Sequence, residues 1–202
     1  MILMYHHIKK QSEDNLTVSQ AVFLRHLDAL KNKKIVYLDA YNPLDPSNAV
    51  ITFDDGYKDI SIYAVPHLKK MNFPFEVFLV GDFVSMGDSG NADFLNSADL
   101  IEIVKSGGRL QYHAKTHPHL ETIYDKNILE AEILTPSELR LLDREGFKWF
   151  AYPFCAYNSD VIDIVKKHYK GARSGKGLGN NDFYTLESLR MDENTEINDF
   201  LK

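Results

Sequence analysis

Segments with the pattern of β-strands alternate with segments with the pattern of α-helices along most of the 202-residue chain. Such alternation is typical of a parallel sheet with helices packed outside it. Six or seven strand-helix units predict an α/β fold, a distorted or incomplete (β/α) barrel, with residues 1–202 in a single domain. The expected strands cover residues 2–6, 49–53, 75–80, 110–113, 148–152 and 169–174, and the expected helices 19–31, 58–71, 97–105, 127–145 and 160–168.

Residues with catalytic chemistry lie at the C-terminal ends of several of the expected strands. In barrels of this type, functional residues gather where the strands end. Scattered surface residues would not share that placement, so we expect these positions to meet at one rim. They are His6, Asp54, Asp55, His113 and the pair Pro153-Phe154.

Two adjacent carboxylates, Asp54 and Asp55, separate the apolar run of residues 49–53 from Gly56. Successive side chains of a strand point to opposite faces, so the two aspartates cannot do the same work while the strand lasts. At the end of the strand the chain twists, and both can border one site in different roles. One carboxylate can bind a metal ion while the other handles a proton. A polar turn with two solvated acids is the alternative interpretation.

His113 and His117 are four residues apart, just after another expected strand. Two imidazoles at this spacing converge on one cation if the linking residues form a helical turn. Two histidines and one carboxylate leave an open position for water on a metal ion. In isolation the pair would suggest a histidine-rich surface loop, but with Asp54-Asp55 it predicts a 2-His-1-Asp metal site. His119 is an alternative to His117 as the second histidine.

The composition and charge of the chain limit the classes of protein to which it can belong. The formal net charge is −6, which argues against non-specific nucleic-acid binding. The single cysteine, Cys155, excludes an internal disulfide and fits a reducing compartment. No run approaches the ~20 apolar residues that a transmembrane helix needs. The first residues lack the pattern of an export signal, which predicts a cytoplasmic protein, or an extracytoplasmic one if a leader has been removed.

Three stretches resemble the polysaccharide deacetylases of the NodB-homology family. The resemblance extends over residues 2–191, and the first stretch is specific when a His-x-x-x-His follows about sixty residues later. The opening, Leu3-Met4-Tyr5-His6-His7-Ile8, is similar to the circularly permuted branch that deacetylates poly-N-acetylglucosamine. The three stretches are Thr52-Phe53-Asp54-Asp55-Gly56, His113-Ala114-Lys115-Thr116-His117-Pro118 and Ala151-Tyr152-Pro153-Phe154.

The resemblance implies a distorted barrel and metal-dependent hydrolysis of N-acetyl groups on sugars. Asp55, His113 and His117 would bind a divalent metal, with zinc expected and Co²⁺, Ni²⁺ or Mn²⁺ as alternatives. Asp54 would be the general base, and the backbone amide of Phe154 would help to form the oxyanion hole. His6 would be the general acid, if it is protonated near neutral pH.

Three residues depart from the family pattern. Ala114 replaces a serine or threonine, Ala151 replaces an arginine that orients the catalytic base, and Cys155 replaces a glycine. These departures leave open the alternative that the protein is a carbohydrate-binding relative with weak catalysis. An O-acetyl esterase could use the same site. Near other expected strand ends, Tyr157 and Arg173 are candidates for contact with the substrate.

Overall fold

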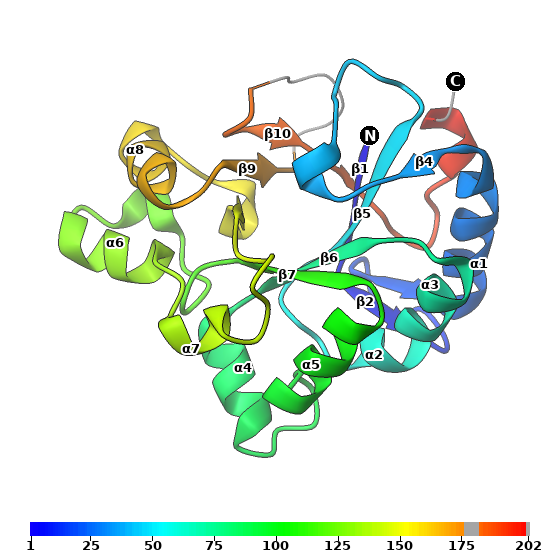
Figure 1. Ribbon diagram of the computed structural model, residues 1–202, viewed down its shortest axis with the longest axis horizontal. Helices are drawn as coiled ribbons and strands as arrows, with labels where there is room; N and C mark the ends of the chain where they lie inside the picture. The colour runs from blue at the N-terminus through cyan, green and yellow to red at the C-terminus, as the bar shows by residue number, and fades with distance from the viewer. Residues whose placement is uncertain (176–181, 201–202) are drawn as a thin grey trace.

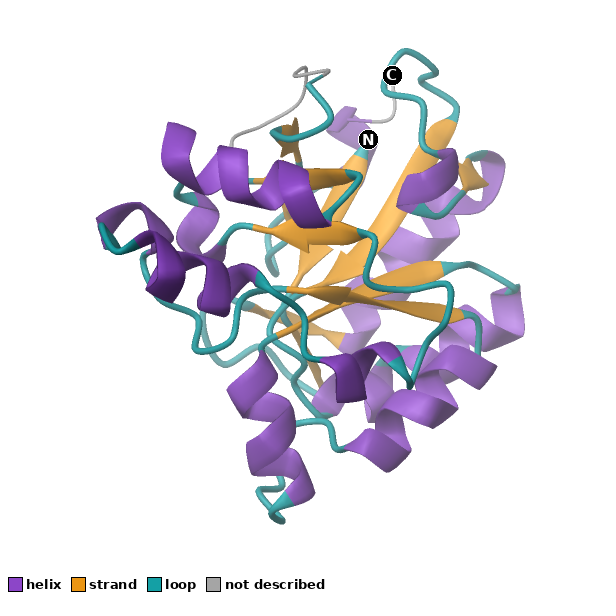
Figure 2. Ribbon diagram, turned by 60° about the vertical axis from the view of Figure 1, so that its left-hand side comes forward, coloured by secondary structure: helices purple, strands orange, loops and turns teal. Residues whose placement is uncertain are grey.

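The computed structural model describes residues 1–175 and 182–200, and a sheet of parallel strands forms its centre (Figure 1). The strands lie in the order β10-β9-β8-β7-β6-β5-β1-β11, and β4 pairs with the first residues of β5. Helices cover the outside of this sheet (Figure 2). Its strands are β1 (Ile2–Tyr5), β4 (Lys34–Ile35), β5 (Asn48–Phe53), β6 (Phe75–Leu79), β7 (Gly108–Tyr112), β8 (Trp149–Ala151), β9 (Gly171–Ser174), β10 (Leu186–Glu187) and β11 (Leu189–Arg190).

One short segment almost closes the sheet into a barrel. Its first part, β10, pairs with β9, and its second part, β11, pairs with β1. Ser188 lies between the two parts, and its backbone N–H donates to the carbonyl of Ser174 over 3.1 Å. The segment therefore gives both edge strands a partner, as closed sheets do. The predicted α/β barrel is confirmed.

Each expected helix is present, two of them in altered form, and α4 (Gly81–Asp88) is a helix that the sequence patterns did not predict. The expected helix 58–71 is divided into two, with Pro66 in the first turn of the second, where proline is tolerated. The expected helix 127–145 is shorter and interrupted around Pro136. The helices are α1 (Gln20–Ala29), α2 (Asp59–Tyr63), α3 (Val65–Met71), α4 (Gly81–Asp88), α5 (Ser97–Lys105), α6 (Lys126–Ile133), α7 (Ser137–Arg140) and α8 (Ser159–His168).

Alternate residues of the strands face the barrel interior or the helices. Leu3 and Ile51 belong to the large core shared with the helices, whereas Ile2 and Val50 pack in a smaller cluster with Phe78. The same alternation brings polar residues into the barrel, because Glu76 and Gln111 are fully buried and hydrogen bond to each other. The interior of this barrel therefore includes a hydrogen-bonded pair of polar side chains beside the apolar cluster.

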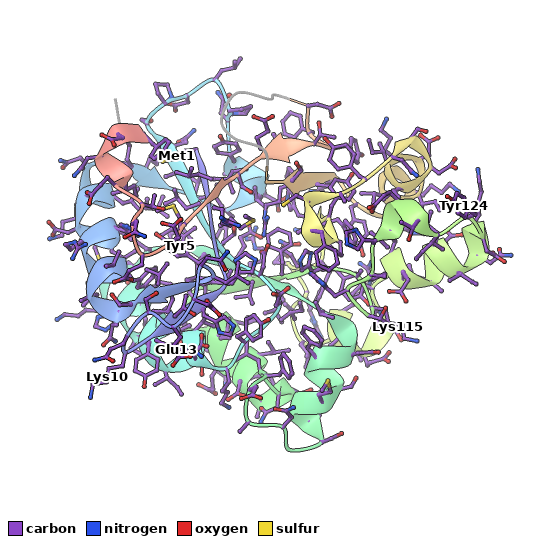
Figure 3. All side chains as sticks on the ribbon, turned by 180° about the vertical axis from the view of Figure 1, so that it is seen from behind. Met1, Tyr5, Lys10, Glu13, Lys115 and Tyr124 are labelled. Carbon is purple, nitrogen blue, oxygen red and sulfur yellow. The ribbon has the colours of Figure 1, made fainter. Side chains whose placement is uncertain are left out.

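A small second sheet, β2 (His7–Lys9) with β3 (Thr17–Ser19), follows β1. Lys10 and Glu13, labelled in Figure 3, mark the loop between these two strands. Among the described residues, no helix is both long enough and apolar enough to cross a bilayer.

Candidate metal centre

The carboxyl ends of the parallel strands place the predicted residues at one rim of the barrel. His6 follows β1, Asp54 and Asp55 follow β5, and His113 follows β7. Tyr5 and Lys115, labelled in Figure 3, mark the end of β1 and the loop after His113. The register keeps these ends level, because Tyr5 is opposite Phe53 and Leu79 is opposite Tyr112.

Asp55, His113 and His117 converge at this rim. Their ligand atoms all lie within 4.8 Å of one another. Asp55 Oδ1 is 3.5 Å from His113 Nε2 and 3.4 Å from His117 Nε2, and the two ring nitrogens are 3.2 Å apart. Ligands at about 2.1 Å from a tetrahedral zinc ion would lie roughly 3.4 Å from one another. The three side chains therefore have the spacing of a metal-ligand set.

The backbone at the end of β5 turns the two aspartates to different positions. Asp54 continues the ladder, with its N–H donating to the carbonyl of Tyr5 over 2.9 Å. Asp55 has φ of +67°, and the Gly56 N–H donates back to the Asp54 carbonyl over 2.8 Å. This three-residue turn is rare and strained. Strain of this kind persists where the surroundings fix it, often at functional sites.

The loop from His113 to His117 is not the helical turn that the spacing suggested. Ala114 and His117 have φ of +67° and +59°, so the chain leaves the right-handed region twice. Neighbouring segments hold the loop, because Gly81 N–H donates to the Ala114 carbonyl and Lys115 N–H donates to the Glu132 carbonyl. Tertiary hydrogen bonds thus bring the imidazoles together without helical geometry.

His119, the alternative ligand, lies outside the trio. Its Nδ1 is 2.9 Å from Glu121 Oε1. Its ring stacks on Phe154 at 4.1 Å between centroids. Because both its ion pair and its ring contact face other residues, His117 is the geometrically favoured partner of His113.

The protonation of the trio fits a cation. Burial lowers the pKa of His113 to about 4, and burial followed by the charge of His113 lowers that of His117 to about 4. His113 Nδ1 donates to the Ala151 carbonyl over 2.7 Å, which leaves the Nε2 lone pair facing the cluster. Asp55 Oδ1 is buried without a hydrogen-bond partner among the described residues. Electron-pair donors facing one another in this way are satisfied by a metal ion.

Asp54 is paired with Arg173 of β9. The guanidinium donates to Asp54 Oδ1, and the side chains are 1% and 3% exposed. Arg173 also lies over the ring of Phe78, 4.4 Å from its centroid. The sequence suggested only that Arg173 could contact substrate. The spacing gave no signal for this pair, because the partners are 119 residues apart.

His6 reaches the rim but is uncharged there. Burial, with contributions from Arg173 and His113, lowers its pKa to about 3. Its Nδ1 is buried without a hydrogen-bond partner among the described residues. His6 was expected to act as general acid if it is protonated near neutral pH, and a pKa of about 3 does not meet this condition.

Phe154 lies in a short turn, Pro153–Cys155, directly after β8. Phe154 and Cys155 have φ of +56° and +57°, a conformation that favours glycine. The Phe154 ring is 55% exposed and makes an edge-on contact with His117, 4.6 Å between centroids. Cys155 therefore has a backbone conformation that a glycine would adopt more readily than a cysteine.

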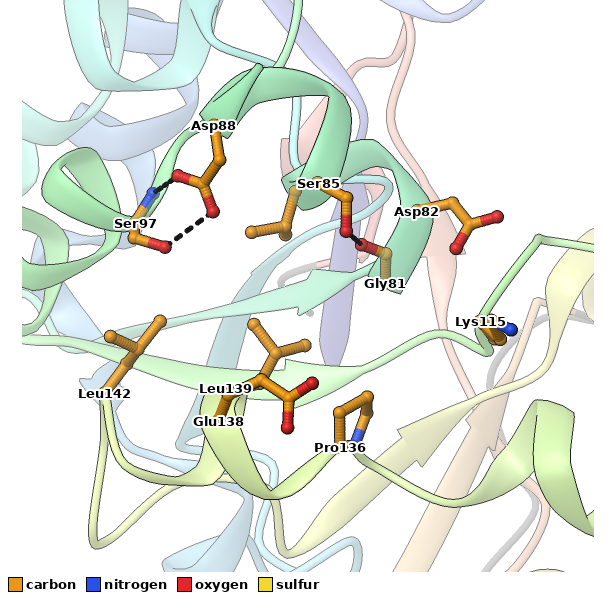
Figure 4. Close-up of a pocket in the computed structure, with 11 residues that line it drawn as sticks. Gly81, Asp82, Ser85, Asp88, Ser97, Lys115, Pro136, Glu138, Leu139 and Leu142 are labelled. Atoms are coloured by element: carbon orange, nitrogen blue, oxygen red, sulfur yellow. Dashed lines mark hydrogen bonds between the residues drawn. The ribbon is translucent and has the colours of Figure 1, made fainter.

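Two cavities flank the rim. One, of about 460 Å³, is lined by Tyr57, whose pKa is raised by burial and then by the nearby charge of Asp55. The other, of about 290 Å³, lies between α4 and α7 (Figure 4). In the second cavity Asp88 accepts from the N–H and hydroxyl of Ser97, and Ser85 donates to the Gly81 carbonyl (Figure 4).

Comparison with known proteins assigns the class. The profile of the polysaccharide deacetylase family matches residues 41–170, and the chain belongs to this family. The chain is 24% identical, over 89% of its length and 69% of the relative, to the poly-β-1,6-N-acetyl-D-glucosamine N-deacetylase of Staphylococcus aureus strain MSSA476.

Two solved structures share the fold. The Streptococcus pyogenes deacetylase PplD, in complex with acetate, has a TM-score of 0.84 at 24% identity, with 96% of this chain and 92% of PplD covered. IcaB from Ammonifex degensii has a TM-score of 0.80 at 18% identity, with 94% and 90% covered. These likenesses concern the fold of the described barrel.

Proposed function

We propose that this deacetylase is metal-dependent and removes N-acetyl groups from N-acetylated sugars in a glycan or glycan precursor. The observation that carries the proposal is the convergence of Asp55, His113 and His117, with Asp54 beside them on the same strand end. A divalent ion held by these three side chains would supply a Lewis acid and lower the pKa of water. Zinc suits this donor set, and Co²⁺, Ni²⁺ or Mn²⁺ would also fit.

Other residues would supply the base, the oxyanion stabilisation and the acid that amide hydrolysis also needs. Asp54 would take the proton of the attacking water, and its ion pair with Arg173 would keep the carboxylate charged and oriented. The backbone N–H of Phe154 would stabilise the oxyanion, a contribution of roughly 3–4 kcal/mol to the barrier. His6 would protonate the departing nitrogen, and its low pKa makes the neutral ring the resting form. It would therefore have to gain a proton during turnover, for example one passed on from Asp54.

The proposed substrate is a polymer or oligomer of N-acetylglucosamine. Support comes from the activity named for the Staphylococcus aureus relative, together with the match to the family profile. An acetyl ester is chemically easier to hydrolyse, so the same site could also act on O-acetyl groups. A weakly catalytic binding protein is less well supported, because Arg173 is paired with Asp54 although Ala151 supplies no cation.

The test measures acetate released from N-acetylglucosamine oligomers by protein supplied with zinc, cobalt, nickel or manganese. We expect metal-dependent release by the wild type, and loss of release with retained metal in Asp54→Asn. His168→Ala, on the distant helix α8, is the matched control and should leave release unchanged. Unchanged release in Asp54→Asn would remove the proposed base. Hydrolysis of an acetyl ester without measurable acetate release from any N-acetyl sugar would favour the esterase.

A further inference from the structure

We propose that Ser188 is a positioning residue for hydrolysis: its hydroxyl holds Arg173, and Arg173 orients the carboxylate of Asp54. This inference rests on the proposed function, in which Asp54 takes the proton of the attacking water. Ser188 lies between β10 and β11, the two short strands that almost close the barrel. Its side chain is fully buried, and it contacts the cation that pairs with the proposed base.

The guanidinium of Arg173 is held on three sides. Its Nη2 donates to Asp54 Oδ1, and its face lies over the ring of Phe78, 4.4 Å from the centroid. A cation is attracted to the ring face as a whole, so this contact does not fix the rotation of the guanidinium in its plane. The second terminal nitrogen, Nη1, donates to Ser188 Oγ over 3.5 Å. The bond to Ser188 therefore selects the rotation in which Nη2 faces Asp54.

The single proton of the Ser188 hydroxyl decides the direction of this bond. Ser188 Oγ donates to the Ser174 carbonyl over 2.5 Å. The other nearby acceptor, Met4 Sδ, is 3.7 Å away, and a thioether sulfur accepts only weakly. With its proton on the Ser174 carbonyl, Oγ can only accept from its remaining neighbours, and arginine has donors alone. The hydroxyl is therefore oriented to accept from Arg173.

The backbone around Ser188 fixes the place of its hydroxyl. Ser188 N–H donates to the same Ser174 carbonyl over 3.1 Å. On one side Glu187 lies opposite Ser174 of β9, and on the other side Leu189 lies opposite Leu3 of β1. Because both neighbours belong to parallel ladders, Ser188 cannot move away from Arg173 unless one of these ladders opens. Closure of the barrel and orientation of the base are thus coupled through one serine.

The experiment measures kcat and KM for acetate release by Ser188→Ala, with Ser174→Ala as the matched control. Each variant removes one buried serine Oγ, and that of Ser174 has no hydrogen-bond partner among the described residues. In Ser188→Ala we expect kcat to fall by roughly 2- to 10-fold, the effect of one hydrogen bond, with KM and metal content unchanged. Ser174→Ala should keep the wild-type kcat. An unchanged kcat in Ser188→Ala, or a change in KM alone, would overturn the inference.

A second comparison tests whether Ser188 acts through Arg173. In an Arg173→Met background, Ser188→Ala should have little further effect on kcat, because the side chain that it positions is already absent. A general effect on the fold would lower kcat by the same factor in both backgrounds. Such equal factors would contradict a positioning role.

Urea unfolding separates this inference from the proposed function, because it needs no turnover. The losses of unfolding free energy in Ser188→Ala and Arg173→Met should be less than additive in the double variant, since each substitution removes the same contact. If the wild type releases no acetate from N-acetyl sugars, the proposed function alone fails, and the kinetic comparison is made with an acetyl ester. Additive losses would overturn the role of Ser188 while deacetylation could stand.

Discussion

Arg173 on β9 donates a charged hydrogen bond to Asp54 at the end of β5, and both side chains are buried. Charge-assisted bonds between buried partners fix orientation as well as charge. In the family pattern an arginine at the position of Ala151 orients the base. Here the cation comes from β9, which pairs with β8 so that Ala151 lies opposite Arg173. The guanidinium can therefore reach the same carboxylate from a neighbouring strand.

Replacement of Arg173 should affect turnover more than metal binding. In Arg173→Met we expect kcat to fall by about 10²-fold, because a misplaced base loses its near-attack geometry. Metal content, measured by atomic emission, should remain at the wild-type level, since Arg173 contacts Asp54 and not the trio. Arg173→Lys should retain more activity, since it keeps the charge but not the planar fork.

The ion pair between Arg173 and Asp54 should contribute strongly to the free energy of unfolding. Removal of one partner leaves a buried charge uncompensated, so Arg173→Met should lower the free energy of unfolding by about 3–5 kcal/mol. The double variant Arg173→Met, Asp54→Asn should recover part of this loss, because no charge is then left buried. Urea unfolding of the single and double variants measures the coupling. Additive losses would mean that the two side chains do not interact in solution.

Metal binding should stabilise the fold through His117 and not through His119. A ligand at 1,000 times its dissociation constant adds about 4 kcal/mol to the stability of the folded state. We expect zinc to raise the melting temperature of the wild type and of His119→Ala, and to have little effect on His117→Ala. Thermal scans with chelator and with added zinc make the comparison. A zinc shift lost in His119→Ala and kept in His117→Ala would reassign the ligand.

Glu76 should make the stability of the protein depend on pH. Burial raises its pKa from 4.5 to about 7, against the opposing hydrogen bonds from Leu38 N–H and Gln111. The folded state therefore holds a proton that the unfolded state has lost between these two values. Its contribution to stability is complete below about pH 4.5 and falls as the pH rises to 7. The full loss is about 3 kcal/mol.

Glu76→Gln removes this titration. In urea unfolding between pH 4.5 and 7.5, the difference in unfolding free energy between the wild type and Glu76→Gln should shift against the wild type as the pH rises, because only the wild type loses the contribution of Glu76. Glu102→Gln, at an exposed position on α5, is the control and should follow the wild type. Parallel curves for the wild type and Glu76→Gln would show that Glu76 has an ordinary pKa.

The sequence could predict those parts of the site that depend on strand ends. Asp55 follows an apolar run, and His113 and His117 come at and just after the end of another expected strand; because parallel strands bring such ends to one rim, their convergence followed from local pattern. Their backbone conformations did not, because the left-handed Ala114 and His117 are held by hydrogen bonds from other segments. Arg173 could not be paired with Asp54 from the sequence, since strand order decides which partner is near.

The fold likewise has parts that the sequence predicts and parts that it does not. Long apolar strands such as β5 and β6 were predictable, whereas β10 and β11 are two residues each and carry no periodic signal. Helix α4 was not expected either. It has only eight residues and includes Gly81 and Gly87, which lower helix propensity. Tertiary contacts explain those glycines, and Gly87 offers a final test.

Gly87 allows α4 to lie directly against Phe94 and Leu95, of which Phe94 lines the cavity beside Tyr57. A Cβ at Gly87 would be 2.5 Å from the Leu95 carbonyl oxygen and 3.0 Å from that of Phe94. These are backbone atoms, so Gly87→Ala must shift the helix or the segment. We expect the free energy of unfolding to fall by about 1–3 kcal/mol, the usual effect of overpacking.

The control is Met86→Ala on the same helix, where the side chain is 43% exposed. It should change stability little, because alanine is compatible with a helix and no close contact is created. Since Leu95 N–H bonds to Gly56 beside Asp55, the shift in Gly87→Ala should also reach the metal centre and weaken zinc binding. Calorimetric titration with zinc would measure this effect. If Gly87→Ala has wild-type stability and wild-type zinc affinity, then α4 does not support the segment around Phe94 and Leu95.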